Sequence, residues 1–391
     1  MSDIKNVCET CPTPEPMQYP DYSANEKSTP DELRAIAVRA MRDMLSVQWC
    51  ADQNYAYRKN GAVNTKLFHY EPGNLYAGMP YTNAGSGIFQ WLSYYDHESG
   101  VFRFDGDSAE LNANIGNSCA ACVCWGWSPV CSTTRDAYAS YNMTRIHGYL
   151  PVGSYTYPED LNSFRDLPTD VIVERNGADV MLESYACIRA ADGLVSTKAV
   201  HVIMAIENAH VVRDADGKID PEESYVMIQD QRGGKGEGFY ERERDGKLIL
   251  FSGRTEYKFT FARLLELCYL PCTSAEFIGK KPYSPATAAF EGNGNDLTGI
   301  LDGEITGNYA PCVLKATLTD EQGTREELAF ATYNSSEKGT EFLKRCKVNK
   351  LALTEADVLS HMQDGKTYTF ALEFTPATGD VLIPIRIPLT K

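Results

Sequence analysis

The sequence lacks several features that would assign a class at once. No apolar run approaches the ~18 residues that a membrane-spanning helix needs. The first eight residues contain no apolar stretch of the kind found in secretory signals. We therefore expect a soluble, cytoplasmic protein, or one associated with the cell envelope if a leader has been removed. No internal repeat is visible, and nothing in the sequence calls for a cofactor.

Positive charge is also scarce. The chain has 37 Lys and Arg against 53 Asp and Glu, which gives a net charge of −16. Nucleic acids and anionic membrane surfaces repel such a protein, so we expect neither as a partner. A length of 391 residues with 43% hydrophobic and 23% charged residues is ordinary for a globular protein with room for two domains.

Cysteine is present but too sparse for a small disulfide scaffold. The twelve cysteines cluster along the chain, and reduced thiols are the simplest interpretation. Cys8 and Cys11 have CxxC spacing without a preceding strand, so we interpret them as an incidental pair. We expect no metal site, because Cys122 and Cys124 point to different faces of the predicted helix and no second paired knuckle follows.

The most informative stretch runs from Asn117 to Trp127. A polar pair, a cysteine and a run of small and aromatic residues predict the start of a buried helix, with Asn117 or Ser118 as its cap. Cys119 then lies in the first turn, where the helix dipole favours thiolate over thiol. Cysteine is also a common buried hydrophobe, and that alternative applies to Cys119 and more strongly to Cys122 and Cys124.

A thiolate nucleophile needs a base, and the chain has only six histidines. His201 opens the β-rich run 200–206, in which His201, Ile203 and Ala205 share one face. A histidine there suits a thiol base, although a structural, hydrogen-bonded role is the alternative. The strand 225–231 returns and ends in three polar residues, of which Gln229 or Gln231 is expected to orient the imidazole.

Two loops resemble ligand-binding motifs only superficially. Residues 214–220 lack calcium ligands of the EF-hand pattern, so we expect a hairpin turn. Residues 233–238 are glycine-rich, but no helix and no Ser or Thr follow the lysine. We therefore reject a phosphate loop and expect a mobile hairpin.

The rest of the chain falls into an arm and two domains. Residues 1–28 are rich in Pro, Glu, Ser and Asn and are expected to form an N-terminal arm. Residues 29–282 begin with a capped helix from Thr29 to about Trp49 and Cys50, and a short helix is expected at 88–96. Residues 283–391 contain short alternating runs separated by turns, which predict an all-β sandwich-like domain, with a helix only near 341–346.

The order of these pieces resembles the NlpC-type papain-like cysteine peptidases, which act on bacterial cell-wall peptides. The similarity covers about residues 65 to 275. Three segments carry it: Gly78, Pro80, Tyr81 and Gly85 in the loop, Ser118-Cys119-Ala120-Ala121-Cys122-Val123-Cys124-Trp125 at the helix start, and Ala191-Asp192-Gly193-Leu194 followed by His201-Val202-Ile203-Met204.

This resemblance implies an α+β fold in which a helix packs on an antiparallel sheet. It also implies the catalytic residues Cys119, His201 and Gln229, with Asp230 and Gln231 as alternatives for the third. Tyr81, Ser118 and Ala120 would then contact a peptide or muropeptide substrate.

Two departures bear on the substrate. The family has an aspartate, implied in holding a free amine of the substrate, where this chain has Ser118, and a serine where it has Ala120. We expect hydrolysis of an amide in a peptidoglycan-derived peptide, of the γ-D-glutamyl–diamino acid type. The alternatives are a binding protein that has lost turnover, and a thiol amidase or acyltransferase on a non-peptide amide. The ligand of the C-terminal domain is not readable from the sequence.

Overall fold

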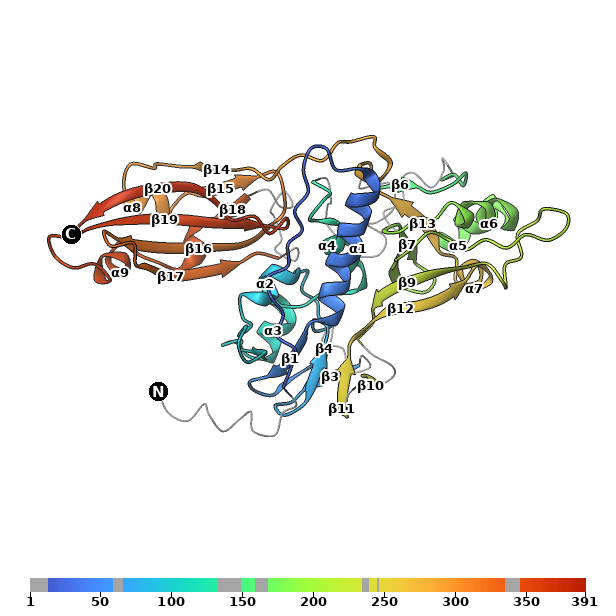
Figure 1. Ribbon diagram of the computed structural model, residues 1–391, viewed down its shortest axis with the longest axis horizontal. Coiled ribbons are helices and arrows are strands. Elements are labelled where there is room, and N and C mark those ends of the chain that lie inside the picture. The colour runs from blue at the N-terminus through green and yellow to red at the C-terminus, as the bar shows by residue number, and fades with distance from the viewer. Residues whose placement is uncertain are drawn as a thin grey trace.

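The computed structural model describes residues 13–58, 66–132, 149–158, 168–233, 239–244, 246–334 and 345–391. In this part of the chain helices alternate with several separate sheets, so the fold is α+β as expected. Figure 1 shows helix α1 (Pro30–Ser46) in the middle, one sheet on one side of it and the C-terminal strands on the other. No helix in these ranges is long and apolar enough to cross a membrane.

Helix α1 (Pro30–Ser46) begins as the sequence predicts. Thr29 and Glu32 form a capping box, and Pro30 occupies the first turn. The helix ends at Ser46, earlier than predicted, because Val47 takes an extended conformation with ψ 123°. The chain then enters a strand, in which the buried Trp49 donates its indole N–H to the Gly78 carbonyl at 2.9 Å.

A six-stranded antiparallel sheet forms one side of the first core. Its described strands pair in the order β12-β9-β8-β7-β13-β6. The strands are β6 (Leu150–Pro151), β7 (Gly193–Ser196), β8 (His201–Ala205), β9 (Tyr225–Gln231), β12 (Gly253–Thr260) and β13 (Leu270–Thr273).

A five-stranded mixed sheet and a two-stranded ribbon lie near the C-terminal end of α1 (Figure 1). The sheet pairs in the order β10-β11-β4-β1-β5, and the ribbon is β2-β3. Their bounds are β1 (Gln48–Ala51), β2 (Tyr55–Arg58), β3 (Leu67–Tyr70), β4 (Leu75–Ala77), β5 (Val101–Phe102), β10 (Tyr240–Arg244) and β11 (Lys247–Phe251).

Helix α4 (Cys119–Trp127) packs between α1 and strands β8 and β9. Gly126 permits this close approach, because a Cβ there would lie 2.8 Å from Met41 of α1 and a Met204 atom of β8 lies at 3.0 Å. The other elements of this part are α2 (Ile88–Leu92), α3 (Ser108–Asn114), α5 (Thr169–Asn176), α6 (Ala178–Ala186), α7 (Phe261–Glu266) and the 3-10 helix η6 (Glu276–Ile278).

The C-terminal part has its own hydrophobic core and is not all-β. The expected strands are present, but α8 and α9 also contribute to this core through Ile300 and Val358. The expected helix near 341–346 is wrong where it can be checked, because Arg345 begins a strand; residues 341–344 lie outside the described residues. The elements are β14 (Ala288–Glu291), α8 (Leu297–Leu301), β15 (Glu304–Gly307), β16 (Pro311–Asp320), β17 (Arg325–Thr332), β18 (Arg345–Lys347), η7 (Val348–Leu351), α9 (Glu355–Ser360), β19 (Thr367–Pro376) and β20 (Leu382–Thr390).

Buried polar contacts join this part to the first core. The Gln90 amide of α2 donates to the Tyr333 carbonyl at 2.7 Å, and Asn334 donates to the Asn114 carbonyl at 3.2 Å. Cys312 and Ala377 belong to the first core although the chain around them belongs to the second. The domain boundary expected at 282 and 283 stays a prediction.

The cysteines are mostly but not entirely reduced. Nine described cysteines are not in disulfides, whereas Cys50 is disulfide-bonded, so the expectation of thiols throughout is wrong at this position. Cys8 and Cys11 lie outside the described residues, as do residues 234–238 of the expected glycine-rich hairpin.

Residues 214–220 form a tight turn in which Asp214 accepts hydrogen bonds from the amides of Asp216 and Lys218.

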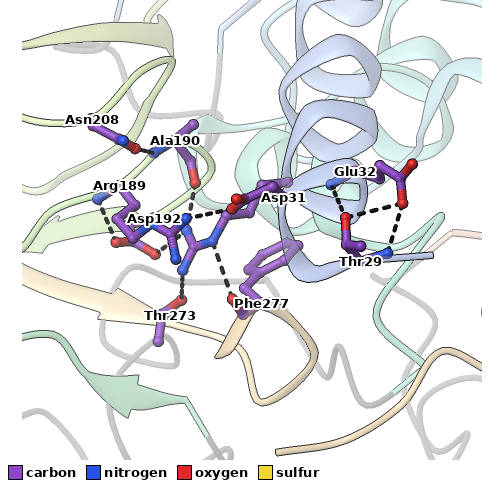
Figure 2. Close-up of polar contacts among 10 residues, drawn as sticks. Thr29, Asp31, Glu32, Arg189, Ala190, Asp192, Asn208, Thr273 and Phe277 are labelled. Atoms are coloured by element: carbon purple, nitrogen blue, oxygen red, sulfur yellow. Dashed lines mark hydrogen bonds and ion pairs between the residues drawn. The ribbon is translucent and has the colours of Figure 1, made fainter. Parts of the chain in front are cut away.

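Arg34 ties α1 to three other segments. Its guanidinium donates to Asp192 Oδ1 at 2.7 Å, to Thr273 Oγ1 at 3.3 Å, and to the carbonyl oxygens of Phe277 and Ala190. Figure 2 labels these four partners. Arg34 and Asp192 are both almost fully buried. Their ion pair therefore positions the turn before β7 against the first helix.

We predict that Arg34→Met lowers the free energy of unfolding by about 3–5 kcal/mol, because it leaves the Asp192 carboxylate buried without its partner. Denaturant unfolding followed by tryptophan fluorescence measures this, since all four tryptophans lie in the first core. The matched control Arg39→Met, at an exposed position of the same helix, should cost less than about 1 kcal/mol. Equal losses in the two variants would contradict this account of the ion pair.

Candidate active site

Cys119 is the first residue of α4, as the sequence predicts. Ser118 is the N-cap in extended conformation, and its hydroxyl accepts a hydrogen bond from the Ala121 amide at 3.4 Å. The loop before it is held by a short parallel bridge between Tyr81 and Asn117. Gly116 has φ +99°, and a Cβ there would lie 2.4 Å from the Pro80 carbonyl, so this approach requires glycine. Cys119 is thereby fixed at the positive end of the helix.

His201 begins strand β8 directly after a tight connection from β7. It pairs in register with Ser196, and the preceding Val200 has φ +50°, an unfavourable conformation for a β-branched residue. The His201 side chain is 10% exposed. Its Nε2 lies 2.9 Å from Asp230 Oδ2, which leaves Nδ1 as the nitrogen for a second partner.

Asp230 is fully buried and receives two cationic partners. Arg254 donates Nε to Oδ1 at 2.9 Å and its terminal nitrogen to Oδ2 at 2.6 Å. The Arg254 guanidinium also lies over the Tyr257 ring, 3.8 Å from its centre. This bidentate pair holds the carboxylate in one orientation.

The charges in this group keep one another ionised. Burial by itself would raise the pKa of Asp230, but hydrogen bonds from Arg254 and His201 outweigh burial and hold that pKa below its ordinary value. Burial would also lower the pKa of His201, yet hydrogen bonds with Asp230 and Cys119 outweigh it and raise the pKa to about 9. At neutral pH the imidazole is therefore protonated.

Cys119 completes the group from the helix side. Its side chain hydrogen-bonds with His201 and with the Tyr81 hydroxyl, and the Cys119 backbone also bonds that hydroxyl. Burial raises the pKa of Tyr81 well above its ordinary value, the Cys119 side chain adds to the rise, and the Cys119 backbone and Arg232 oppose it. The phenol stays protonated and can donate a hydrogen bond. The structure thus brings Tyr81, Cys119, His201 and Asp230 together.

The prediction of Gln229 as the third residue is wrong in geometry. Gln229 pairs with Met204 across β8 and β9, and paired residues lie on the same face of a sheet. His201 lies on the opposite face from Met204, together with Asp230. The Gln229 amide accordingly donates to the Val38 carbonyl at 3.0 Å and to Met204 sulfur at 3.3 Å. Of the three polar residues, Asp230 contacts the imidazole.

Gln231 lies near the site without contacting His201. Its amide nitrogen donates to the Met79 carbonyl at 2.8 Å and to Asn117 Oδ1 at 3.4 Å. Its amide oxygen is buried and has no hydrogen-bond partner among the described residues, and the same holds for the amide oxygen of Gln229. Gln231 therefore braces the loop that carries Cys119.

The other candidate residues are buried in the core or cap the helix. Ala120 is buried behind Cys119, and Ser118 caps the helix at a half-buried position. Cys122 is fully buried, and burial raises the pKa of its thiol well above the ordinary value, which disfavours it as a nucleophile. Cys124 lies 3.5 Å from the Tyr149 hydroxyl in the core. Within the described ranges no group of three or more metal-ligating side chains is found.

Arg254 is the functional residue that sequence reasoning missed. It pairs in register with Asp230 across β9 and β12, at the edge of an irregularity between Arg254 and Tyr257. An arginine directly opposite an aspartate is a recognisable signal only when the register of the two strands is known.

Comparisons with protein-family models, with curated proteins and with solved structures find no match for this chain. The function must therefore be argued from the geometry of the site.

We predict that His201 titrates at about 9 in the wild type and that Asp230→Asn lowers its pKa, because burial is then opposed by the contact with Cys119 alone. NMR titration of the imidazole ring measures this. Gln229→Met serves as the control, because Gln229 does not contact the ring. The assignment of Asp230 fails if Asn leaves the pKa near 9 while Met changes it.

Proposed function

We propose that this protein is a cysteine-dependent hydrolase that cleaves an amide bond, with a papain-like, NlpC-type arrangement of its site. The observation that carries the proposal is the chain of contacts from Cys119 at a helix N-terminus through His201 to the buried pair Asp230 and Arg254. Nucleophile, base and a group that orients the base are the parts that thiol hydrolysis requires.

The proposed reaction begins with the Cys119 thiolate and the His201 imidazolium. The sulfur attacks the carbonyl carbon, and the negative charge moves to the carbonyl oxygen, for which the Tyr81 hydroxyl and the Cys119 amide are nearby donors. His201 Nδ1 gives its proton to the leaving amine as the C–N bond breaks. The product of this half is a thioester on Cys119.

Water then completes the reaction. The neutral His201 accepts a proton from water, the resulting hydroxide attacks the thioester carbonyl, and the carboxylic acid leaves as the C–S bond breaks. Cys119 returns to the thiolate and His201 to the imidazolium. Asp230 stabilises the imidazolium and fixes the ring so that Nδ1 faces sulfur throughout.

The substrate class follows from the resemblance of the motifs to cell-wall peptidases. We propose a peptidoglycan-derived peptide, of the γ-D-glutamyl–diamino acid type. Ser118 favours a second candidate, since it offers no carboxylate to a substrate ammonium. That candidate is an amidase or acyltransferase acting on an amide without a neighbouring free amine.

The location of such a substrate bears on the expected cytoplasmic location. Disulfides persist mainly in oxidising compartments, and Cys50 is disulfide-bonded. This residue therefore weighs against a reducing compartment, and a location at the cell envelope agrees better with a cell-wall peptide as substrate. We propose no nucleic-acid partner, in line with the net charge of −16.

We predict that the wild type releases the diamino acid from L-Ala-γ-D-Glu-diaminopimelate, measured by liquid chromatography with mass spectrometry. Cys119→Ala should abolish release, and Asp230→Asn should reduce kcat/KM by about 10²-fold or more, because the base loses its orienting carboxylate. Gln229→Met should stay within a few-fold of the wild type.

The outcomes separate the chemistry from the substrate. No release from this peptide, together with hydrolysis of an amide lacking a free amine, would replace the first substrate class by the second. No hydrolysis of either, with an unreactive Cys119, would overturn the enzyme proposal and favour a binding protein.

A further inference from the structure

A pocket lies between α1 and the segments around Arg189 and Ile206. Its volume is about 480 Å³, which falls within the range of ~300–1,000 Å³ typical of small-molecule sites. None of its lining residues belongs to the candidate active site. It is lined by Asp31, Arg34, Ala35, Val38, Arg39, Arg42, Arg189, Ala190, Ile206 and Asn208.

The lining combines a small apolar floor with a cationic rim. Ala35, Val38, Ala190 and Ile206 supply the apolar atoms. The backbone of α1 at Val38 is bonded to strand β9, because the Val38 carbonyl accepts a hydrogen bond from the Gln229 amide. Figure 2 shows the Ala190 backbone bonded to Asn208 on the same side. This part of the wall is fixed by hydrogen bonds within the fold.

The four arginines differ in what they can offer a ligand. Arg34 is buried and its donors are taken by Asp192, Thr273 and two carbonyl oxygens. Arg39, Arg42 and Arg189 are exposed or half-buried at the rim. These three are the cations that face solvent in the pocket.

The rim has more hydrogen-bond donors than acceptors. Each guanidinium carries five N–H donors. Arg39 gives one to the Asp21 carbonyl and lies over the Tyr22 ring, 5.6 Å from its centre, and Arg189 gives one to Asp31. No hydrogen bond or ion pair of the Arg42 guanidinium is found among the described residues, although the charges of Arg39 and Arg42 oppose the rise that burial causes in the pKa of Asp43. Among the described lining residues Asp31 is the one acidic residue, and it already pairs with Arg189. Such a cationic pocket stands out in a chain of net charge −16.

We propose that this pocket binds a small organic anion, with a carboxylate or phosphate head and an apolar body. Arg39 and Arg42 are three residues apart on one helix and therefore neighbours on its surface. Their guanidinium groups hold the anionic head by charge-assisted hydrogen bonds, and the apolar body lies on Val38 and Ile206. This ligand site is separate from the proposed hydrolase site and does not depend on it.

The test is isothermal titration calorimetry with phenyl phosphate, phenylacetate and the neutral phenylacetamide. We expect saturable binding of the two anions, weakened at least about tenfold in Arg39→Ala/Arg42→Ala. The control variant Arg386→Ala removes an exposed arginine from β20 of the C-terminal part and should bind as the wild type does. Cys119→Ala should also bind unchanged, which separates this pocket from the active site.

Three results for the anions and the amide would overturn the proposal, and a fourth comes from the Cys119→Ala variant. They are the absence of saturable anion binding, equal affinity in the wild type and the double-arginine variant, and binding of phenylacetamide as strong as that of phenylacetate. Loss of binding in Cys119→Ala would instead assign the anion to the active site and overturn the second site. Carboxylate and phosphate heads are told apart by comparing the two anions in the wild type.

Discussion

The rest of the site depends on how one buried carboxylate is compensated. Removing an ion from water costs several kcal/mol even after relaxation, and Asp230 has no exposure at all. Arg254 from β12 and His201 from β8 meet this cost from two sides. The charge of Arg254 allows Asp230 to stay ionised, and Asp230 in turn helps to keep His201 protonated. In the proposed mechanism, the protonated His201 stabilises a thiolate at Cys119. The pairing of β8, β9 and β12 therefore determines which charged side chains meet in the site.

The fold could be predicted wherever its cause is local. The capping box at Thr29 and Glu32 fixes the start of α1, and the β-rich runs give β8 and β9. The order of strands in the six-stranded sheet could not be predicted, because it depends on contacts between segments far apart in the chain. Helices α8 and α9 were missed for another reason: at five and six residues they are too short for a helical period to show.

The site divides in the same way. Cys119 and His201 carry local signals, a helix start and a strand start. The choice among Gln229, Asp230 and Gln231 depends on which face of β9 meets His201, and all three are polar, so no alternation of polarity in the sequence marks that face. Once Met204 is known to pair with Gln229, period-two geometry assigns Asp230 to the side of His201. The sequence alone does not specify the register between β8 and β9, and without it the third residue of the site could not be chosen correctly.

The central claim is that Asp230 and His201 activate Cys119. The most direct test is the pH dependence of iodoacetamide alkylation at Cys119, followed by mass spectrometry in the wild type, His201→Ala and Asp230→Asn. The account predicts rapid alkylation near pH 6 in the wild type, slowed at least about tenfold in both variants, since a thiol outside such a pair has a pKa near ~8.5. Alkylation of Cys119 at the rate of an ordinary thiol, indifferent to both substitutions, would contradict it.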